Sequence, residues 1–130
     1  MPVVKVEMRA GKSKEYKKEL LKIIHEALVR DFQIPDADRN HRILEYSPEN
    51  MEIPANKSAD FIGIEITIFR GRTFEAKKNL YKTITEKLTA HLGIAGNDLM
   101  IILHEVPLEN WGIRGGQPAS EVDLGFNVKA

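Results

Sequence analysis

Apolar and polar residues alternate in some stretches of this chain and recur at helical spacing in others. Residues 3–8 alternate, which predicts a strand with one buried face. Ser13 is then a candidate N-cap for a helix that runs to about Asp31, because apolar residues follow it at helical spacing. Pro35 and the polar turn behind it end that helix, and residues 41–46 predict a second strand.

The same order of elements returns after a polar connection rich in turn-forming residues. Residues 61–69 predict the most regular strand of the chain, with isoleucine at every second position. Thr73 is the candidate N-cap of a second helix, and Gly93 stands where a glycine commonly closes a helix. Residues 99–106 are apolar almost throughout, which predicts a fourth strand in the centre of the sheet.

The two strand–helix–strand units match at an offset of 60 positions. The matches are Gly11-Lys12-Ser13 with Gly71-Arg72-Thr73, Lys17-Lys18 with Lys77-Lys78, Ile34 with Ile94, Asp38 with Asp98 and Glu45 with Glu105. A tandem β-α-β repeat follows from this pattern. Right-handed crossovers place both helices on the same side, so we predict an α+β fold with two helices on one face of a four-stranded sheet.

The repeat also predicts how the chain is organised. We expect one domain over residues 1–130, with halves at about 1–47 and 60–106 and a C-terminal extension over 107–130. The short alternating segment 122–128 is expected to add a strand to its own sheet or to a neighbour's. Because the helices cover only one sheet face, we predict that the other face is hidden against further copies of the chain in a homo-oligomer.

Composition and charge exclude several classes of function. Nineteen basic and nineteen acidic side chains cancel, which predicts no binding of nucleic acid or of an anionic membrane. No apolar run spans a bilayer and no secretory signal opens the chain, so the cytoplasm is the expected location. Cysteine is absent and the histidines lack ligand spacing, so we expect no metal and no cofactor. His25 and His91 fall on the predicted helices and are expected to be partly exposed.

Pro2 is the first candidate for chemistry. A small residue behind an initiator methionine usually leads to removal of that methionine, which would give Pro2 a free secondary amine. A free α-amino group has a pKa of about 7.7–8.0, and burial or nearby positive charge lowers it. Such an amine serves as a base near neutral pH, or as an acid if its pKa stays high. The alternative is that proline stands second for no catalytic reason.

The repeat provides an internal control for the remaining candidates. Asp38 has a counterpart in Asp98, so a turn-capping role and a catalytic role stay equally open. Arg72 stands where the first half has a lysine, and a solvated side chain is the alternative to a role facing a pocket. Arg70 and Pro2 have apolar counterparts and are therefore the stronger candidates. Two arginines at a strand end, before a helix N-terminus, suit an anion because guanidinium groups bind carboxylates through two hydrogen bonds.

Together these features resemble the tautomerase superfamily over nearly the whole chain, and most closely malonate semialdehyde decarboxylase and its relatives. The matching segments are Pro2 behind Met1, Pro35-Asp36-Ala37-Asp38-Arg39 for Pro-x-x-Asp-Arg, Arg70-Gly71-Arg72 for Arg-Pro-Arg, and Asn110-Trp111-Gly112-Ile113 for Asp-Trp-x-Phe. Gly71 replaces the proline between the arginines, and Ile113 stands where the decarboxylase has an aromatic ring. This altered pocket wall leaves the substrate open.

The resemblance implies an enzyme, an isomerase that uses Pro2 as general acid or base on a small 2-oxo or enol carboxylate. It assigns Arg70 and Arg72 to the substrate carboxylate or carbonyl, and Asp38 to orienting the substrate, a water or Pro2. It assigns the exclusion of water to Trp111 and Ile113, which line the pocket. A decarboxylase with a protonated proline and a non-catalytic interaction protein of the same fold are the alternatives. The resemblance further implies a homotrimer.

Overall fold

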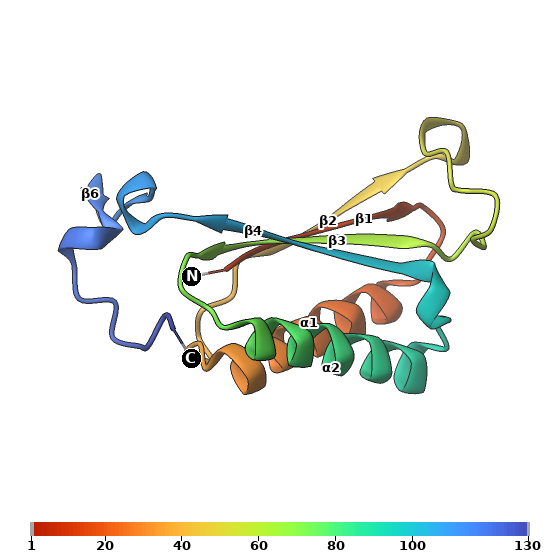
Figure 1. Cartoon of the computed structure of the whole chain (residues 1–130). Helices are drawn as coiled ribbons and strands as arrows, with labels where there is room; N and C mark the ends of the chain where they lie inside the picture. Colours follow the sequence, from red (N-terminus) through yellow and green to blue (C-terminus); the bar gives the residue numbers. More distant parts are fainter. Residues whose placement is uncertain (1, 130) are drawn as a thin grey trace.

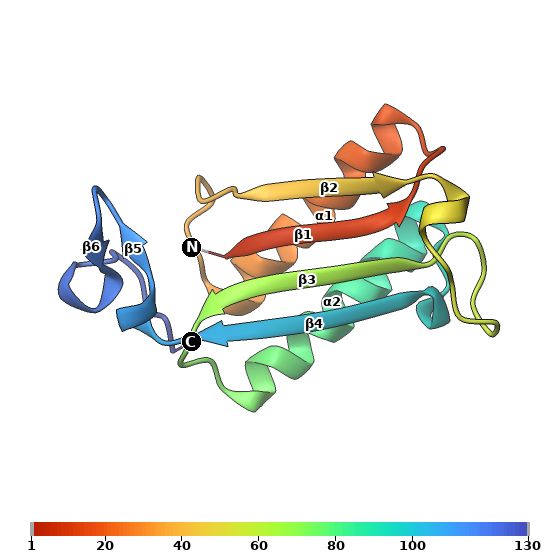
Figure 2. The same ribbon diagram turned by 90° about the horizontal axis from the view of Figure 1, so that it is seen from above.

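Four strands form one sheet, and two long helices pack on the same face of it (Figure 1). The structure is a computed structural model that describes residues 2–129. The main elements are β1 (Val3–Arg9), α1 (Lys14–Phe32), β2 (His41–Tyr46), β3 (Ile62–Phe69), α2 (Phe74–Leu92) and β4 (Leu99–Val106). Figure 2 shows the strand order β2-β1-β3-β4, in which β1 and β3 pair antiparallel and each outer strand pairs parallel with its neighbour. The predicted α+β fold is confirmed.

The two helices begin and end alike. Ser13 precedes α1 and Thr73 precedes α2, and each side chain accepts a hydrogen bond at 3.1 Å from the backbone amide three residues on. Both helices contain 19 residues. Gly93 closes α2 with a φ of 68°, and Gln33 closes α1 with a φ of 55°. Both predicted N-caps and the predicted C-terminal glycine are therefore confirmed.

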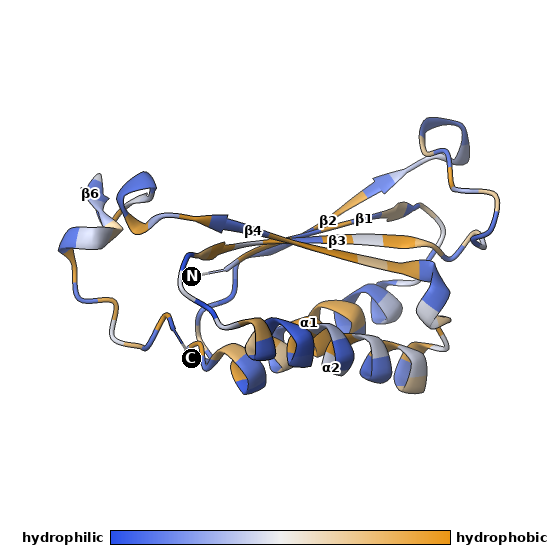
Figure 3. Cartoon of the chain, viewed as in Figure 1, coloured by the Kyte–Doolittle hydropathy of each residue, from blue (hydrophilic) through white to orange (hydrophobic). Residues whose placement is uncertain are grey.

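The hydrophobic core lies between the helices and the sheet. Its members include Val4, Val6 and Met8 of β1, the alternate isoleucines of β3, Leu20, Ile24, Leu28 and Phe32 of α1, and Leu80, Ile84 and Leu88 of α2. Burial of one such side chain contributes about 1.5–3 kcal/mol. The helix surface farthest from the sheet is mainly hydrophilic (Figure 3). Within residues 2–129, neither helix is long and apolar enough to cross a membrane.

β4 lies at one edge of the sheet, so its predicted central position is wrong. Met100 and Ile102 of β4 face away from the helices, and they are 50% and 38% exposed. The run of apolar residues therefore reflects an apolar outer face on an edge strand, not burial between two strands. Leu44 on the opposite edge strand, β2, is 37% exposed on the same outer face. This is the face that the sequence predicts to be covered by another copy of the chain.

The C-terminal extension returns to the end of the sheet where β3 and β4 finish (Figure 1). β5 (Gly112–Ile113) and β6 (Gln117–Pro118) form a short antiparallel pair. Residues 122–129 form no strand in the single chain, so the expected strand on its own sheet is wrong, whereas pairing with a neighbour's sheet stays a prediction. A local turn interrupts the alternation there: the Asp123 carboxylate accepts a hydrogen bond from the Gly125 amide at 2.9 Å.

Candidate functional site

The candidate residues gather at the end of the sheet where β1 begins and β3 ends. Pro2 is buried and directly precedes β1. The antiparallel register pairs Val3 with Thr67, which places Pro2 beside the last residues of β3. A β1 amide donates to the Asn40 carbonyl at 2.9 Å, which brings the loop between α1 and β2 to the same end. Asp38 belongs to that loop, so the fold brings two of the predicted residues to one place.

A cavity of about 290 Å³ opens at this end of the molecule. It is lined by Pro35, Ala37, Asp38, Phe69, Ile113, Arg114, Leu124 and Phe126. Its volume is close to the lower limit of typical ligand pockets, about 300 Å³. The charged residues of its wall are Asp38 and Arg114, and most of the rest is apolar. The cavity thus combines one carboxylate and one guanidinium group with an otherwise apolar wall.

Arg72 is buried, with 8% of its surface exposed, so the alternative of a solvated side chain is wrong. Its guanidinium group donates to the carbonyl of Phe32 and lies 4.8 Å from the centre of the Phe32 ring. A cation above an aromatic ring is attracted by the ring's electrons, most strongly when it is desolvated. Burial lowers the pKa of Arg72 to about 10, and the group therefore remains charged at neutral pH. Arg72 ties the start of α2 to the end of α1.

Arg70 is exposed and lines a different cavity, of about 430 Å³. Gly71 separates it from Arg72 and has a φ of 134°. This conformation is readily adopted only by glycine, and it interrupts the extended backbone between the two arginines. In the single subunit, therefore, neither arginine lines the cavity that contains Asp38.

Trp111 packs against Phe69, a residue of the cavity wall. Its indole Nε1 donates to the Val106 carbonyl at 3.2 Å. Its ring meets that of Phe69 edge to face, with 4.7 Å between the ring centres and 67° between the planes. Aromatic pairs prefer this geometry. Phe69 itself lines the cavity, so the predicted role of Trp111 in excluding water would be exerted through Phe69.

His25 is fully buried beneath the loop that carries Asp38, so its expected partial exposure is wrong. Its Nε2 lies 2.8 Å from the Asp36 carbonyl oxygen and 3.3 Å from the Asp36 carboxylate. Both oxygens are acceptors, so Nε2 carries the proton and donates it. The His41 ring lies 5.2 Å away, and burial, followed by the charges of His25 and Arg39, lowers the pKa of His41 to about 4. His41 is therefore neutral at pH 7.

Family profiles described as tautomerase enzyme match two overlapping parts of the chain, residues 38–114 and residues 2–58. The chain belongs to the tautomerase family. Probable tautomerase YusQ of Bacillus subtilis strain 168 is 26% identical over 90% of this chain and 96% of its own length. 2-hydroxymuconate tautomerase of Comamonas testosteroni is 35% identical over 39% of this chain and 81% of its own length.

Solved structures of other proteins share this fold. Malonate semialdehyde decarboxylase superposes with a TM-score of 0.81 and 25% identity, over 89% of this chain and 93% of its own. A fused 4-OT, solved as a symmetric trimer, shares the fold with a TM-score of 0.80 and 24% identity, over 91% of this chain and 96% of its own. The predicted resemblance to the tautomerase superfamily is thus confirmed.

The sequence pattern does not predict several wall residues of this tautomerase-family chain. Phe69 ends β3 on the face opposite the isoleucines, and this position is the only sequence feature that could indicate a place in the cavity wall. Leu124 and Phe126 come from the extension, whose path no periodic pattern predicts. Arg114 has a φ of 49° and donates from Nη1 to the Asp123 carbonyl at 2.7 Å, which holds the extension near the wall.

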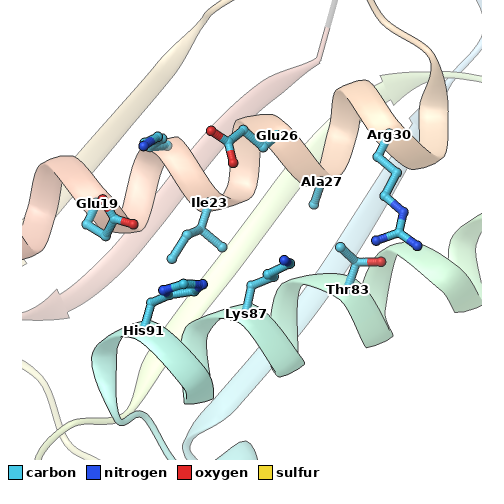
Figure 4. Close-up of a pocket in the computed structure, with 9 residues that line it drawn as sticks. Glu19, Ile23, Glu26, Ala27, Arg30, Thr83, Lys87 and His91 are labelled. Carbon is cyan, nitrogen blue, oxygen red and sulfur yellow. The ribbon is translucent and has the colours of Figure 1, made fainter.

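A third cavity of the tautomerase-family chain, of about 280 Å³, lies between α1 and α2 (Figure 4). Its walls mix acidic and basic side chains, including Glu19, Glu26, Arg30 and Lys87. None of the predicted site residues lines it. Within residues 2–129, no three histidine, aspartate or glutamate side chains are grouped so that they could hold a metal ion. The sheet end with Pro2 and Asp38 therefore remains the candidate active site.

Proposed function

We propose that this chain is a tautomerase in which the amine of Pro2, freed by removal of Met1, transfers protons on a small 2-oxo or enol carboxylate. The observation that carries the proposal is the burial of Pro2 at the sheet end that also holds Asp38 and its cavity. General acid–base catalysis by a positioned group contributes about 10²–10⁴-fold to a rate. No cofactor is needed, because only a proton moves.

In the proposed reaction, the neutral amine of Pro2 takes the proton from the enol hydroxyl of the substrate. The C=O bond forms, the C=C electron pair moves to carbon, and Pro2 returns the proton to that carbon. Burial disfavours the charged ammonium form and so favours the base. Asp38 orients the substrate, a water molecule or Pro2, and its negative charge favours the ammonium form. The balance between these two effects sets the pKa of Pro2.

The two arginines have different proposed tasks because their surroundings differ. Arg70, which is exposed at the end of β3, binds the substrate carboxylate. Arg72 is buried against Phe32 and does not line the Asp38 cavity of a single subunit, so its charge would act on the substrate carbonyl or carboxylate only in the assembled oligomer. Ile113 in the wall and Trp111 behind Phe69 exclude water. All of these roles assume a small carboxylate as the substrate.

Decarboxylation is the second candidate function. The similarity to malonate semialdehyde decarboxylase over 89% of the chain favours it. In this reaction a protonated Pro2 donates a hydrogen bond to the carbonyl oxygen of a 3-oxo acid. The bond to the carboxylate breaks, carbon dioxide leaves, and the electron pair is held as an enolate that is then protonated. The protonation state of Pro2 separates the two candidates.

We further propose that the active form is a cytoplasmic homotrimer. The sheet face without helices exposes Met100 and Ile102, which is apolar surface suited to another subunit. The fused 4-OT of similar fold forms a trimer. Analytical ultracentrifugation at micromolar concentration tests the proposal, and a monomer there would contradict it.

Replacement of Pro2 tests the function directly. After mass spectrometry has established that Met1 is absent, Pro2→Ala is compared with Pro48→Ala, which changes an exposed proline far along the chain. Ketonisation of 2-hydroxymuconate is followed by ultraviolet absorbance. We expect Pro2→Ala to lower kcat/KM by about 10²-fold or more, because a primary amine in a different position replaces the base, while Pro48→Ala leaves it unchanged. Equal rates in all three proteins would favour a non-catalytic role.

Titration of Pro2 then separates the two reactions. Protein labelled with nitrogen-15 proline gives the pKa of the amine by NMR. A value at or below about 7 means that a usable base is present at neutral pH, and it supports tautomerisation. A value above about 9 means a standing acid and supports decarboxylation. Retention of Met1 would leave no proline amine and would overturn both.

A further inference from the structure

We propose that His25 is a positioning residue that fixes the loop carrying Asp38 to helix α1. His25 lies in α1 and donates from Nε2 to the Asp36 carbonyl at 2.8 Å. Within the same loop, the Asp38 amide donates to the Pro35 carbonyl at 3.0 Å. The two hydrogen bonds connect the helix to the turn and the turn to Asp38. The inference rests on the proposed role of Asp38 beside Pro2.

The position of His25 in the core requires an explanation. Its ring is fully buried in a helix whose neighbouring core residues are Ile24 and Leu28. Burying an imidazole costs free energy unless its N–H finds an acceptor, so an apolar residue would be the simpler choice here. The acceptor that His25 finds is a loop carbonyl two residues before Asp38. The polar ring is therefore best explained by the need to fix this loop.

The other half of the repeat shows what the same place looks like without this link. The counterparts of His25 and Asp36 at the offset of 60 are Thr85 and Gly96. A Cβ placed on Gly96 would lie 3.5 Å from Thr85 Cγ2, which is ordinary van der Waals contact. That loop is held instead by Asp98, which accepts two hydrogen bonds from Ser58. His25 thus links the first loop to α1, whereas the second loop is held through Asp98.

The test compares His25→Leu, which removes the donor, with His25→Gln, whose amide nitrogen keeps a donor near the place of Nε2. We expect His25→Leu to lower kcat about 10-fold with little change in KM, since a small misplacement of a catalytic group is costly. We also expect the pKa of Pro2 to fall, because the Asp38 carboxylate moves away from it. His25→Gln should restore both values to within about threefold of the original chain. Thr85→Val is the matched control and should change neither.

A lower melting temperature in His25→Leu and His25→Gln alike, with kcat and the pKa of Pro2 unchanged, would overturn the proposal. Should His25→Leu fail to fold, His25→Asn takes its place, because its shorter amide cannot reach the Asp36 carbonyl. Amide chemical shifts of residues 36–39 report the loop position without any activity. If Pro2→Ala is fully active, the proposed function fails, yet these shifts still test the link. If Pro2→Ala is inactive and His25→Leu matches the original chain in every readout, only the link fails.

Discussion

The loops that follow α1 and α2 hold equivalent places in the repeat, yet their aspartates have different surroundings. Asp98 is buried, and its carboxylate accepts hydrogen bonds from the Ser58 amide at 2.8 Å and the Ser58 hydroxyl at 2.5 Å. These bonds hold the pKa of Asp98 below its ordinary value. Asp38 instead lines the cavity at the candidate site. One position of the repeat thus serves as a structural clamp in one half and as a candidate for chemistry in the other.

The strand ends show the same division. Arg9 ends β1 and donates to the Met51 carbonyl from two nitrogens, at 3.1 and 2.9 Å. Its counterpart Phe69 ends β3 and packs edge to face against Trp111, which is the counterpart of Met51. One end of the sheet is therefore fastened by hydrogen bonds to backbone, and the other is built from aromatic rings beside a cavity. The repeat provides a scaffold, and the differences between its halves mark the candidate site.

Exchange of each aspartate for asparagine tests this division with the largest expected effect. We expect Asp38→Asn to lower kcat/KM by about 10²-fold, because Asp38 orients the substrate, a water molecule or Pro2 in the proposed acid–base reaction. Asp98→Asn should keep the activity and lower the melting temperature by roughly 5 °C, because it weakens hydrogen bonds to a charged group. Steady-state kinetics and calorimetry on both variants provide the measurement. Equal losses of activity and stability in the two variants would show that the loops have the same role.

The stability of the protein at acidic pH gives a further test of the role of Asp98. Its carboxyl has a lower pKa in the folded protein than its reference value of 3.8. The stabilisation is therefore present above the reference value and is lost as the pH falls through the folded pKa. Melting temperatures of the original chain and of Asp98→Asn should accordingly converge towards pH 2. A gap that stays constant from pH 6 to pH 2 would contradict the assignment.

The scaffold could be predicted from the sequence because its signals are local and occur twice. Ser13 and Thr73 stand directly before periodic apolar stripes, and both cap as predicted. The edge position of β4 could not be predicted. Apolar residues on both faces of a strand indicate that both faces are covered, but they do not show whether the same chain or another subunit covers them. His25 was misjudged because its acceptor lies 11 residues further along the chain. Its burial depends on the path of a loop, and the spacing of residues along a helix does not predict that path.

The candidate site was predictable only in part. Pro2 and Asp38 were found through their place in the repeat and a family resemblance, and the fold brings them to one end of the sheet. The separation of Arg70 from Arg72 could not be foreseen, because it follows from the backbone at Gly71, whose φ is 134°. Spacing of two residues in an extended chain would have placed both side chains on one face.

The pH dependence of stability gives a second, smaller test of the same comparison. His41 on β2 has a pKa of about 4 in the folded protein, against a reference value of 6.5. Between these values the unfolded chain binds a proton that the folded chain does not, so the free energy of unfolding falls as the pH drops from 6.5 towards 4. The counterpart in the second half is Ile101, which does not titrate. His41→Ile should therefore reduce the loss of stability between pH 7 and pH 5.

Urea denaturation at both pH values measures this loss. His91→Gln, which changes an exposed histidine of α2, is the matched control and should keep the pH dependence of the original chain. An unchanged pH dependence in His41→Ile would mean that His41 titrates alike in the folded and unfolded chain. The partial burial of His41 would then have no effect on its protonation.

The N-caps give the smallest expected effect and test where the two halves are the same. Ser13→Ala and Thr73→Ala each remove one side-chain hydrogen bond of 3.1 Å to the first turn of a helix of 19 residues. Loss of such a cap costs about 1 kcal/mol, so the two variants should lower the free energy of unfolding by similar amounts in urea denaturation. Thr73 directly follows Arg72, whereas Ser13 lies at the opposite end of the sheet. An added loss of kcat/KM in Thr73→Ala alone would therefore indicate that the start of α2 belongs to the site, and equal activity would confine the site to the strand ends and the Asp38 loop.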